Sequence, residues 1–134
     1  MANTVAVTKI LEGQKDAVFH VYLLCDGASG ELSNQTLIDP LVDLSPVLTA
    51  GADLTVTELW WEIVGFQARL DFDATAKSHI WLLNEGSGNH VCFDSVGGIK
   101  DRSGAGATGK LIVNTAGFTA ATDEGSIIIK VRKN

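Results

Sequence analysis

An alternation of apolar and polar residues in the middle of the chain is the feature that most constrains its fold. From residue 66 to 72 every second side chain is apolar: Phe66, Ala68, Leu70 and Phe72. Successive side chains of a β-strand point to opposite faces, so this period of two is typical of a strand with one buried face. Similar alternation recurs between residues 53 and 94, a stretch that holds all three tryptophans. The pattern predicts a β-rich fold.

Residues 16–25 are apolar at nearly every position. One alternating set is Ala17, Phe19, Val21, Leu23 and Cys25, and the other is Val18, His20, Tyr22 and Leu24. A strand with two largely apolar faces lies in the interior of a sheet, or has its second face buried against a partner subunit. We expect one of these two arrangements here.

Residues 54–72 contain no turn signal except Gly65. One strand of that length would exceed the usual range of roughly 3 to 10 residues, and glycine within a strand pattern often marks a bulge or a bend. The chain is therefore expected to turn at Gly65 and to pass from one sheet to another.

A β-hairpin is predicted further along the chain. Pairing Ile80 with Phe93 and Leu82 with Val91 places the apolar side chains of both strands on one face and leaves residues 84–89 as the loop. A slip of one residue would turn that apolar set toward solvent.

Together these patterns predict an all-β fold of about eight strands with little or no helix, in one domain spanning residues 1–134. Such strands suit a two-layer β-sandwich or a barrel. Residues 31–50 are interrupted by Pro40 and Pro46, which favours an ordered arm or a pair of short edge strands. The glycine-rich residues 95–109 are expected to form a long surface loop.

The composition narrows the range of partners. A net charge of -6 argues against a surface that grips nucleic-acid phosphates. No apolar stretch approaches the roughly 20 residues that span a bilayer, and the first residues carry no secretory signal. We therefore expect no nucleic acid and no membrane as partner. Cys25 and Cys92 are expected to be free thiols in a chain made in a reducing cytoplasm.

Residues 104–110 (GAGATGK) fit the pattern G-x-G-x-x-G and nearly fit a P-loop. Both phosphate-binding motifs require a helix after the glycines, and a P-loop also requires a hydroxyl where Leu111 stands. The residues that follow, KLIVN, are typical of a strand. We interpret the segment as a flexible loop.

The predicted hairpin places four potential zinc ligands on one face: His79, His90, Cys92 and Asp94. Strand neighbours at i and i+2 converge poorly on one small ion, so we favour a partly solvated face with a cross-strand His–Asp pair over a metal-dependent enzyme. No nucleophile elbow or oxyanion loop surrounds Cys92. The sequence therefore predicts no catalytic residue, no metal and no cofactor.

Four aromatic residues are candidates for partner contact: Trp60, Trp61, Trp81 and Tyr22. Trp60 and Trp61 are adjacent, so one is expected in the core and the other outside. An outward Trp60 would join Glu62 and Val64 in a partly apolar patch, and such patches mark partner surfaces. The alternative is that both rings pack within the fold. Sugar binding is disfavoured, because no cluster of polar sugar-binding residues accompanies the rings.

Four segments carry a resemblance to a known family: MANTVAVTKILEG, ELWWEIVGFQARLDFDA, SHIWLLNEGSG and TDEGSIIIKVRKN. Through them the chain resembles small virion proteins of tailed bacteriophages, especially capsid decoration or cement proteins. The resemblance implies a jelly-roll-like β-sandwich, often a homotrimer, seated on the major capsid protein of the virion. The termini or residues 31–50 would then reach a neighbour. The alternative is a carbohydrate- or receptor-binding β-sandwich module of a phage tail or fibre.

Overall fold

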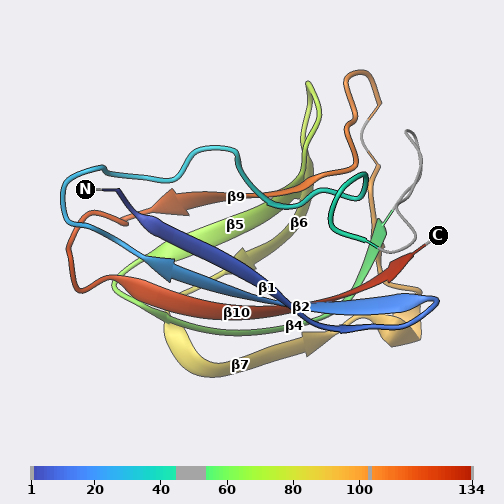
Figure 1. Ribbon diagram of the computed structural model, residues 1–134, viewed down its shortest axis with the longest axis horizontal. Coiled ribbons are helices and arrows are strands. Elements are labelled where there is room, and N and C mark those ends of the chain that lie inside the picture. Colours follow the sequence, from blue (N-terminus) through green and yellow to red (C-terminus); the bar gives the residue numbers. More distant parts are fainter. Residues whose placement is uncertain (1, 45–53, 103, 134) are drawn as a thin grey trace.

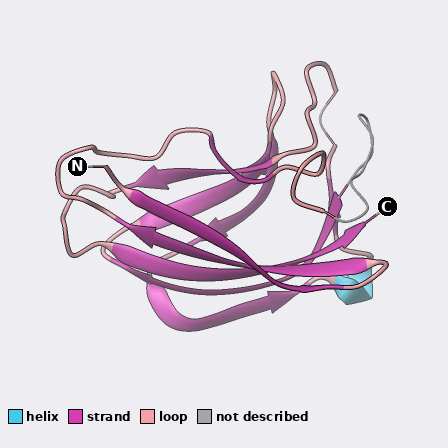
Figure 2. Ribbon diagram, viewed as in Figure 1, coloured by secondary structure: helices cyan, strands magenta, loops and turns pink. Residues whose placement is uncertain are grey.

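The computed structural model describes residues 2–44, 54–102 and 104–133. It shows two antiparallel β-sheets packed face to face, with a single three-residue 3-10 helix in the described part of the chain (Figures 1 and 2). The predicted all-β sandwich is confirmed. The described residues form ten strands, where the sequence predicted about eight.

The larger sheet, sheet A, has six strands. Their order is β1 (Thr4–Glu12), β2 (Asp16–Leu24), β10 (Glu124–Lys133), β4 (Leu54–Val64) and β7 (Gly86–Cys92), and the short β8 (Ile99–Lys100) also pairs with β4. The smaller sheet, sheet B, has the order β3 (Gln35–Ile38), β9 (Leu111–Ala116), β5 (Gln67–Phe72) and β6 (Ser78–Leu83). The 3-10 helix η1 spans Asp94–Val96.

The strand pairing is that of a jelly roll. The outermost pair in the sequence is β2 with β10 in sheet A, and the next is β3 with β9 in sheet B. Closer to the middle of the sequence, β4 pairs with β7 in sheet A and β5 pairs with β6 in sheet B. The pairs are therefore nested, outermost with outermost, and alternate between the two sheets. This is how eight strands wrap as one long hairpin into a double-sheet jelly roll.

The turn predicted at Gly65 is confirmed. Gly65 lies between β4 of sheet A and β5 of sheet B, with a φ of 87°. At that φ a side chain would strain the backbone, which favours glycine.

The predicted hairpin of residues 79–94 is wrong. β6 pairs with β5 in sheet B, and β7 pairs with β4 in sheet A, so the two-residue connection at Asn84 and Glu85 crosses from one sheet to the other. His79 lies opposite Asp71, and Cys92 lies opposite Glu58. Alternation defines the buried face of a strand, but it does not define which strand is its neighbour.

Between the sheets lies a continuous apolar core that includes Phe19, Phe72 and Phe118.

The second prediction to be corrected concerns residues 95–109, where η1 and β8 interrupt the expected loop. Residues 31–44 contribute one short edge strand, β3, and the rest of the predicted arm, with Pro46, lies outside the described residues.

Candidate functional site

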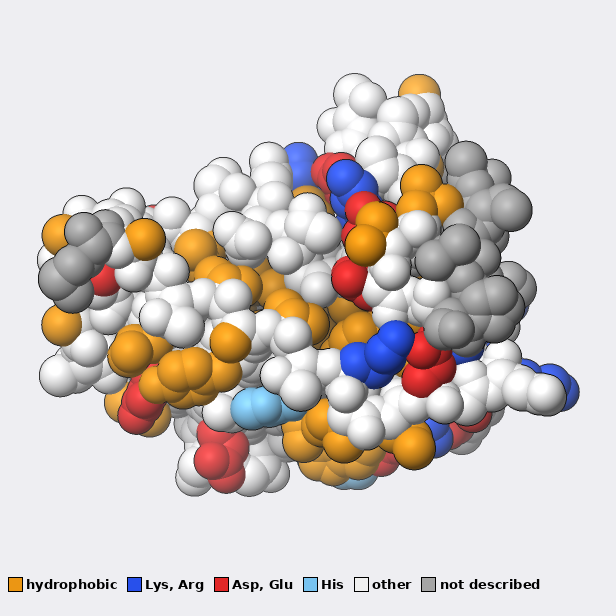
Figure 3. Space-filling view, in the orientation of Figure 1, with side chains coloured by type: hydrophobic (Ala, Val, Ile, Leu, Met, Phe, Trp, Pro, Cys, Tyr) orange, Lys and Arg blue, Asp and Glu red, His pale blue; other side chains and the backbone are white. Residues whose placement is uncertain are grey.

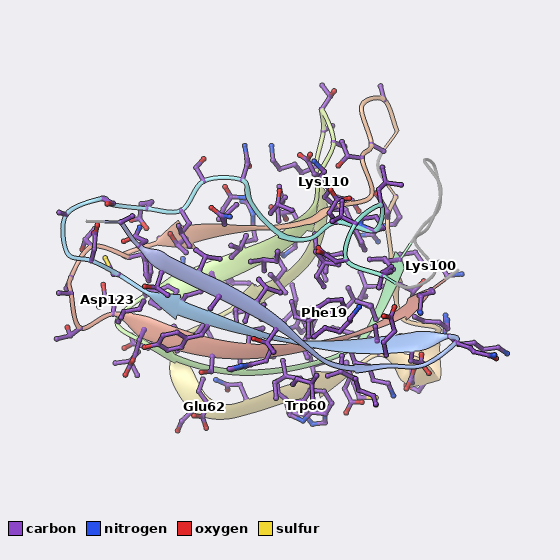
Figure 4. The ribbon with its side chains drawn as sticks, in the orientation of Figure 1. Phe19, Trp60, Glu62, Lys100, Lys110 and Asp123 are labelled. Carbon is purple, nitrogen blue, oxygen red and sulfur yellow. The ribbon has the colours of Figure 1, made fainter. Side chains whose placement is uncertain are left out.

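The outer face of sheet A carries two parallel rows of side chains that face away from the core. Cross-strand pairing aligns Tyr22, Ser126 and Glu62 in one row. The next row consists of His20, Ile128, Trp60 and His90. The side chains in both rows are half-buried or exposed. Figure 4 shows Trp60 and Glu62 projecting from the side of sheet A opposite to Phe19, which points between the sheets.

A groove of about 450 Å³ runs across this face. We call it the Trp60 groove, and its lining includes Ile10, Val18, His20, Trp60, Glu62, Ser126 and Ile128. The register explains its form, because these residues come from four adjacent strands, from β1 through β2 and β10 to β4. Hydrophobic side chains gather along this side of the molecule, interspersed with histidine and acidic side chains (Figure 3).

Trp60 is held in place by its neighbour on β7. The indole stacks on the His90 imidazole with ring centroids 4.9 Å apart and an interplanar angle of 14°. His90 is itself fixed by a 2.6 Å contact between its Nε2 atom and Glu58 Oε2. One side of the indole is therefore covered by His90, and the side toward β10 and β2 lines the groove.

Four polar side chains that line the groove have no hydrogen-bond partner in the described part of the chain. Within residues 2–44, 54–102 and 104–133, the side chains of His20, Glu62 and Ser126 make no hydrogen bond or ion pair, and Asn89 Nδ2 is buried without a partner. Tyr22 differs, because its hydroxyl donates to Glu124 Oε2 at 2.9 Å. That hydrogen bond to a carboxylate raises the pKa of Tyr22 above its usual value.

The structure places the four candidate aromatic residues at different locations. Trp60 and Tyr22 share the outer face of sheet A. Trp61 is 6% exposed in the core, and its Nε1 donates to the carbonyl of Asn84 at 3.1 Å. Trp81 lies on β6 at the edge of sheet B, 38% exposed, with its ring edge-on to Phe93 at 5.0 Å. The pair at 60 and 61 thus divides between outside and core, as alternation predicts.

Around Trp81 is a second apolar hollow of about 450 Å³, which we call the Trp81 surface. It is lined by His79, Ile80, Trp81, Leu82, Ile99 and Arg102. Leu82 is 46% exposed. Val96 is 75% exposed and lines a neighbouring hollow together with Ile99 and Arg102. Sequence reasoning missed Arg102 and Ile99 as companions of Trp81, because the two segments are about twenty positions apart and in different sheets.

The potential metal ligands do not lie as the hairpin predicted. His79 contacts Asp71 Oδ1 through Nδ1 at 3.0 Å, and Arg69 Nε donates to Asp71 Oδ2 at 2.9 Å, so these three side chains form a hydrogen-bond network on sheet B. Cys92 and Asp94 instead lie near Glu58, with one potential ligand atom of each within 4.8 Å of the others.

The two thiols have different surroundings. Cys25 is buried, in contact with the carbonyl of Phe118, whereas Cys92 is exposed. Both are free. The glycine-rich residues 104–110 lead directly into β9, so the helix that a phosphate-binding loop requires does not follow them.

Comparisons with models of known protein families and with curated protein sequences find no match. The fold and the surfaces described above are therefore the basis for any functional assignment. Among the described residues, no helix is long and apolar enough to cross a membrane.

Proposed function

We propose that this protein is a non-enzymatic virion component that decorates a tailed-bacteriophage capsid and stabilises it by binding the major capsid protein. It would be made in the host cytoplasm and reside in the virion. The resemblance of four segments of the chain to capsid decoration proteins suggests this function. The jelly-roll pairing, the acidic net charge and the exposed aromatic side chains support it.

The observation that carries the proposal is the Trp81 surface. It combines exposed Trp81, Leu82 and Arg102, and the exposed Val96 lines an adjoining hollow that shares Ile99 and Arg102 with it. Tryptophan and arginine are enriched among the residues that dominate binding energy at protein interfaces, and contiguous apolar patches mark interaction sites.

The position of Trp81 in the fold adds a second reason. β6 is an edge strand of sheet B, so one side of its backbone is not paired within that sheet. Edge strands present backbone groups that a strand of another protein can use. We propose the major capsid protein as that partner, and a homo-oligomer, with a trimer favoured, as the form that binds.

The test is sedimentation with capsid particles that lack this protein. We expect saturable co-sedimentation and a higher temperature of capsid rupture. Trp81→Ala and Arg102→Glu should each weaken binding by about tenfold or more, since truncation of such residues typically costs about 2 kcal/mol. Val64→Ala is the matched control, because Val64 is 58% exposed on the other sheet.

Far-UV circular dichroism and thermal melting of each variant separate loss of contact from loss of fold. Absence of binding by the folded wild-type protein would contradict the proposed function. Equal binding by wild type, Trp81→Ala and Arg102→Glu would contradict the assignment of the surface.

A further inference from the structure

The Trp60 groove differs chemically from the Trp81 surface. Ile128 and Trp60 are the apolar members of one row of side chains, and Ser126 and Glu62 lie in the neighbouring row. Rows two residues apart along a strand are separated by about 7 Å. Within a row, facing side chains have Cβ atoms about 5 Å apart. One small ligand can therefore touch both rows at once.

The uncommitted polar groups indicate the kind of ligand. Glu62 offers a carboxylate that accepts hydrogen bonds, Ser126 a hydroxyl that donates and accepts, and His20 an imidazole that does both. None of the three is satisfied by another side chain in the described part of the chain. A purely apolar occupant would cover these groups without pairing them, which is unfavourable.

The aromatic platform fits the same ligand. His90 and Glu58 fix the orientation of the indole, so its free side is presented to the groove without further ordering. A pyranose ring has C–H groups on one face, which can lie against an indole, and hydroxyl groups at its rim, which can reach carboxylate, hydroxyl and imidazole side chains.

We propose that the Trp60 groove binds a neutral pyranoside, with the sugar ring against Trp60 and Ile128. Glu62 accepts hydrogen bonds from sugar hydroxyl groups, and Ser126 and His20 complete the set. The negative charge of Glu62 disfavours sugars that carry a carboxylate. This function goes beyond capsid decoration and uses a different surface, so neither proposal depends on the other.

The test is titration of the full-length protein with methyl glycosides of glucose, galactose, mannose and N-acetylglucosamine, followed by calorimetry and by the Trp60 indole N–H signal in ¹H–¹⁵N spectra. At least one glycoside should bind saturably in the millimolar range or more tightly. Trp60→Ala should abolish binding, and Glu62→Gln should weaken it by about tenfold or more, because a hydrogen bond to a charged group is lost. Trp81→Ala, which alters an exposed tryptophan outside the groove, is the matched control and should bind normally.

Three results would overturn the proposal. The first is the absence of saturable binding by the folded wild-type protein for all four glycosides up to about 10 mM. The second is unchanged binding by folded Trp60→Ala, and the third is equal or tighter binding of N-acetylneuraminic acid. If Trp60→Ala instead abolishes capsid co-sedimentation and no glycoside binds, the groove is a protein contact.

Discussion

At the scale of single residues, the corner at Gly65 shows how a local conformation is tied to a distant segment. Asp123 is buried next to Gly65, and its Oδ2 accepts hydrogen bonds from the backbone N–H groups of Thr119 and Ala120, each at 3.0 Å. A Cβ atom added at Gly65 would collide with the Asp123 carboxylate. The corner between the sheets therefore requires glycine for two reasons, its positive φ and this close approach.

Gly65→Ala should consequently destabilise the fold more than a matched change at Gly30. Gly30 has a similar φ of 80°, but nothing lies within 4 Å of an added Cβ, so Gly30→Ala should cost only about 1–2 kcal/mol of backbone strain. Gly65→Ala should cost at least about 1 kcal/mol more, because the hydrogen bonds of Asp123 must shift. Urea unfolding of both variants measures the difference, and equal losses would show that the Asp123 contact is unimportant.

The residue scale also shows what sequence reasoning could reach at the groove. Adjacency alone predicted that Trp60 and Trp61 divide between outside and core. It could not reveal that Ser126 and His20, on two other strands, lie in the rows beside Trp60 and Glu62. Cross-strand neighbours are separated by up to about a hundred positions in sequence, and no local pattern records them.

At the scale of elements, the main lesson comes from β6 and β7. Their alternation and the short connection between them favour a hairpin, yet they belong to opposite sheets. Each strand buries its apolar side chains from its own side of the core, so the same pattern satisfies both arrangements. Local sequence cannot separate a hairpin from a crossing between sheets when the connection is short and polar.

Engineered disulfides distinguish the two arrangements. In a Cys92→Ser background, Arg69→Cys with Leu82→Cys should form a disulfide, because these residues are directly opposite on β5 and β6. Leu82→Cys with Val91→Cys, the pair that a hairpin would bring together, should remain reduced. Peptide mass mapping after mild oxidation reads the outcome. A disulfide between positions 82 and 91 alone would contradict the strand pairing.

At the scale of the whole molecule, β10 connects the two halves of sheet A. It pairs with β2 on one side and with β4 on the other, and its inward side chains Ile127, Ile129 and Val131 are fully buried. Burial of three such side chains contributes about 5–9 kcal/mol, which is comparable to the whole net stability of a typical domain. Because β10 lies between β2 and β4, the last strand of the chain is essential to sheet A, whose edge is formed by the first strand, β1.

Removal of residues 124–134 should therefore abolish cooperative thermal unfolding. Removal of residues 2–11, which are most of edge strand β1, should leave a folded protein with a lower melting temperature. The reason is that Val5 is the one residue of β1 that packs against the core. Calorimetry compares the two truncations. A cooperative transition in the protein that lacks β10 would contradict its central position.

The sequence by itself determined that the chain is all-β, that Gly65 is a corner, and which side of most strands is buried. These properties follow from the period of two and from the steric freedom of glycine, and both act within a few residues. Only the tertiary structure decided which strands are neighbours, that β6 and β7 separate into different sheets, and which polar side chains surround Trp60. Strand pairing depends on the total burial achieved by all ten strands together, and no single segment contains that information.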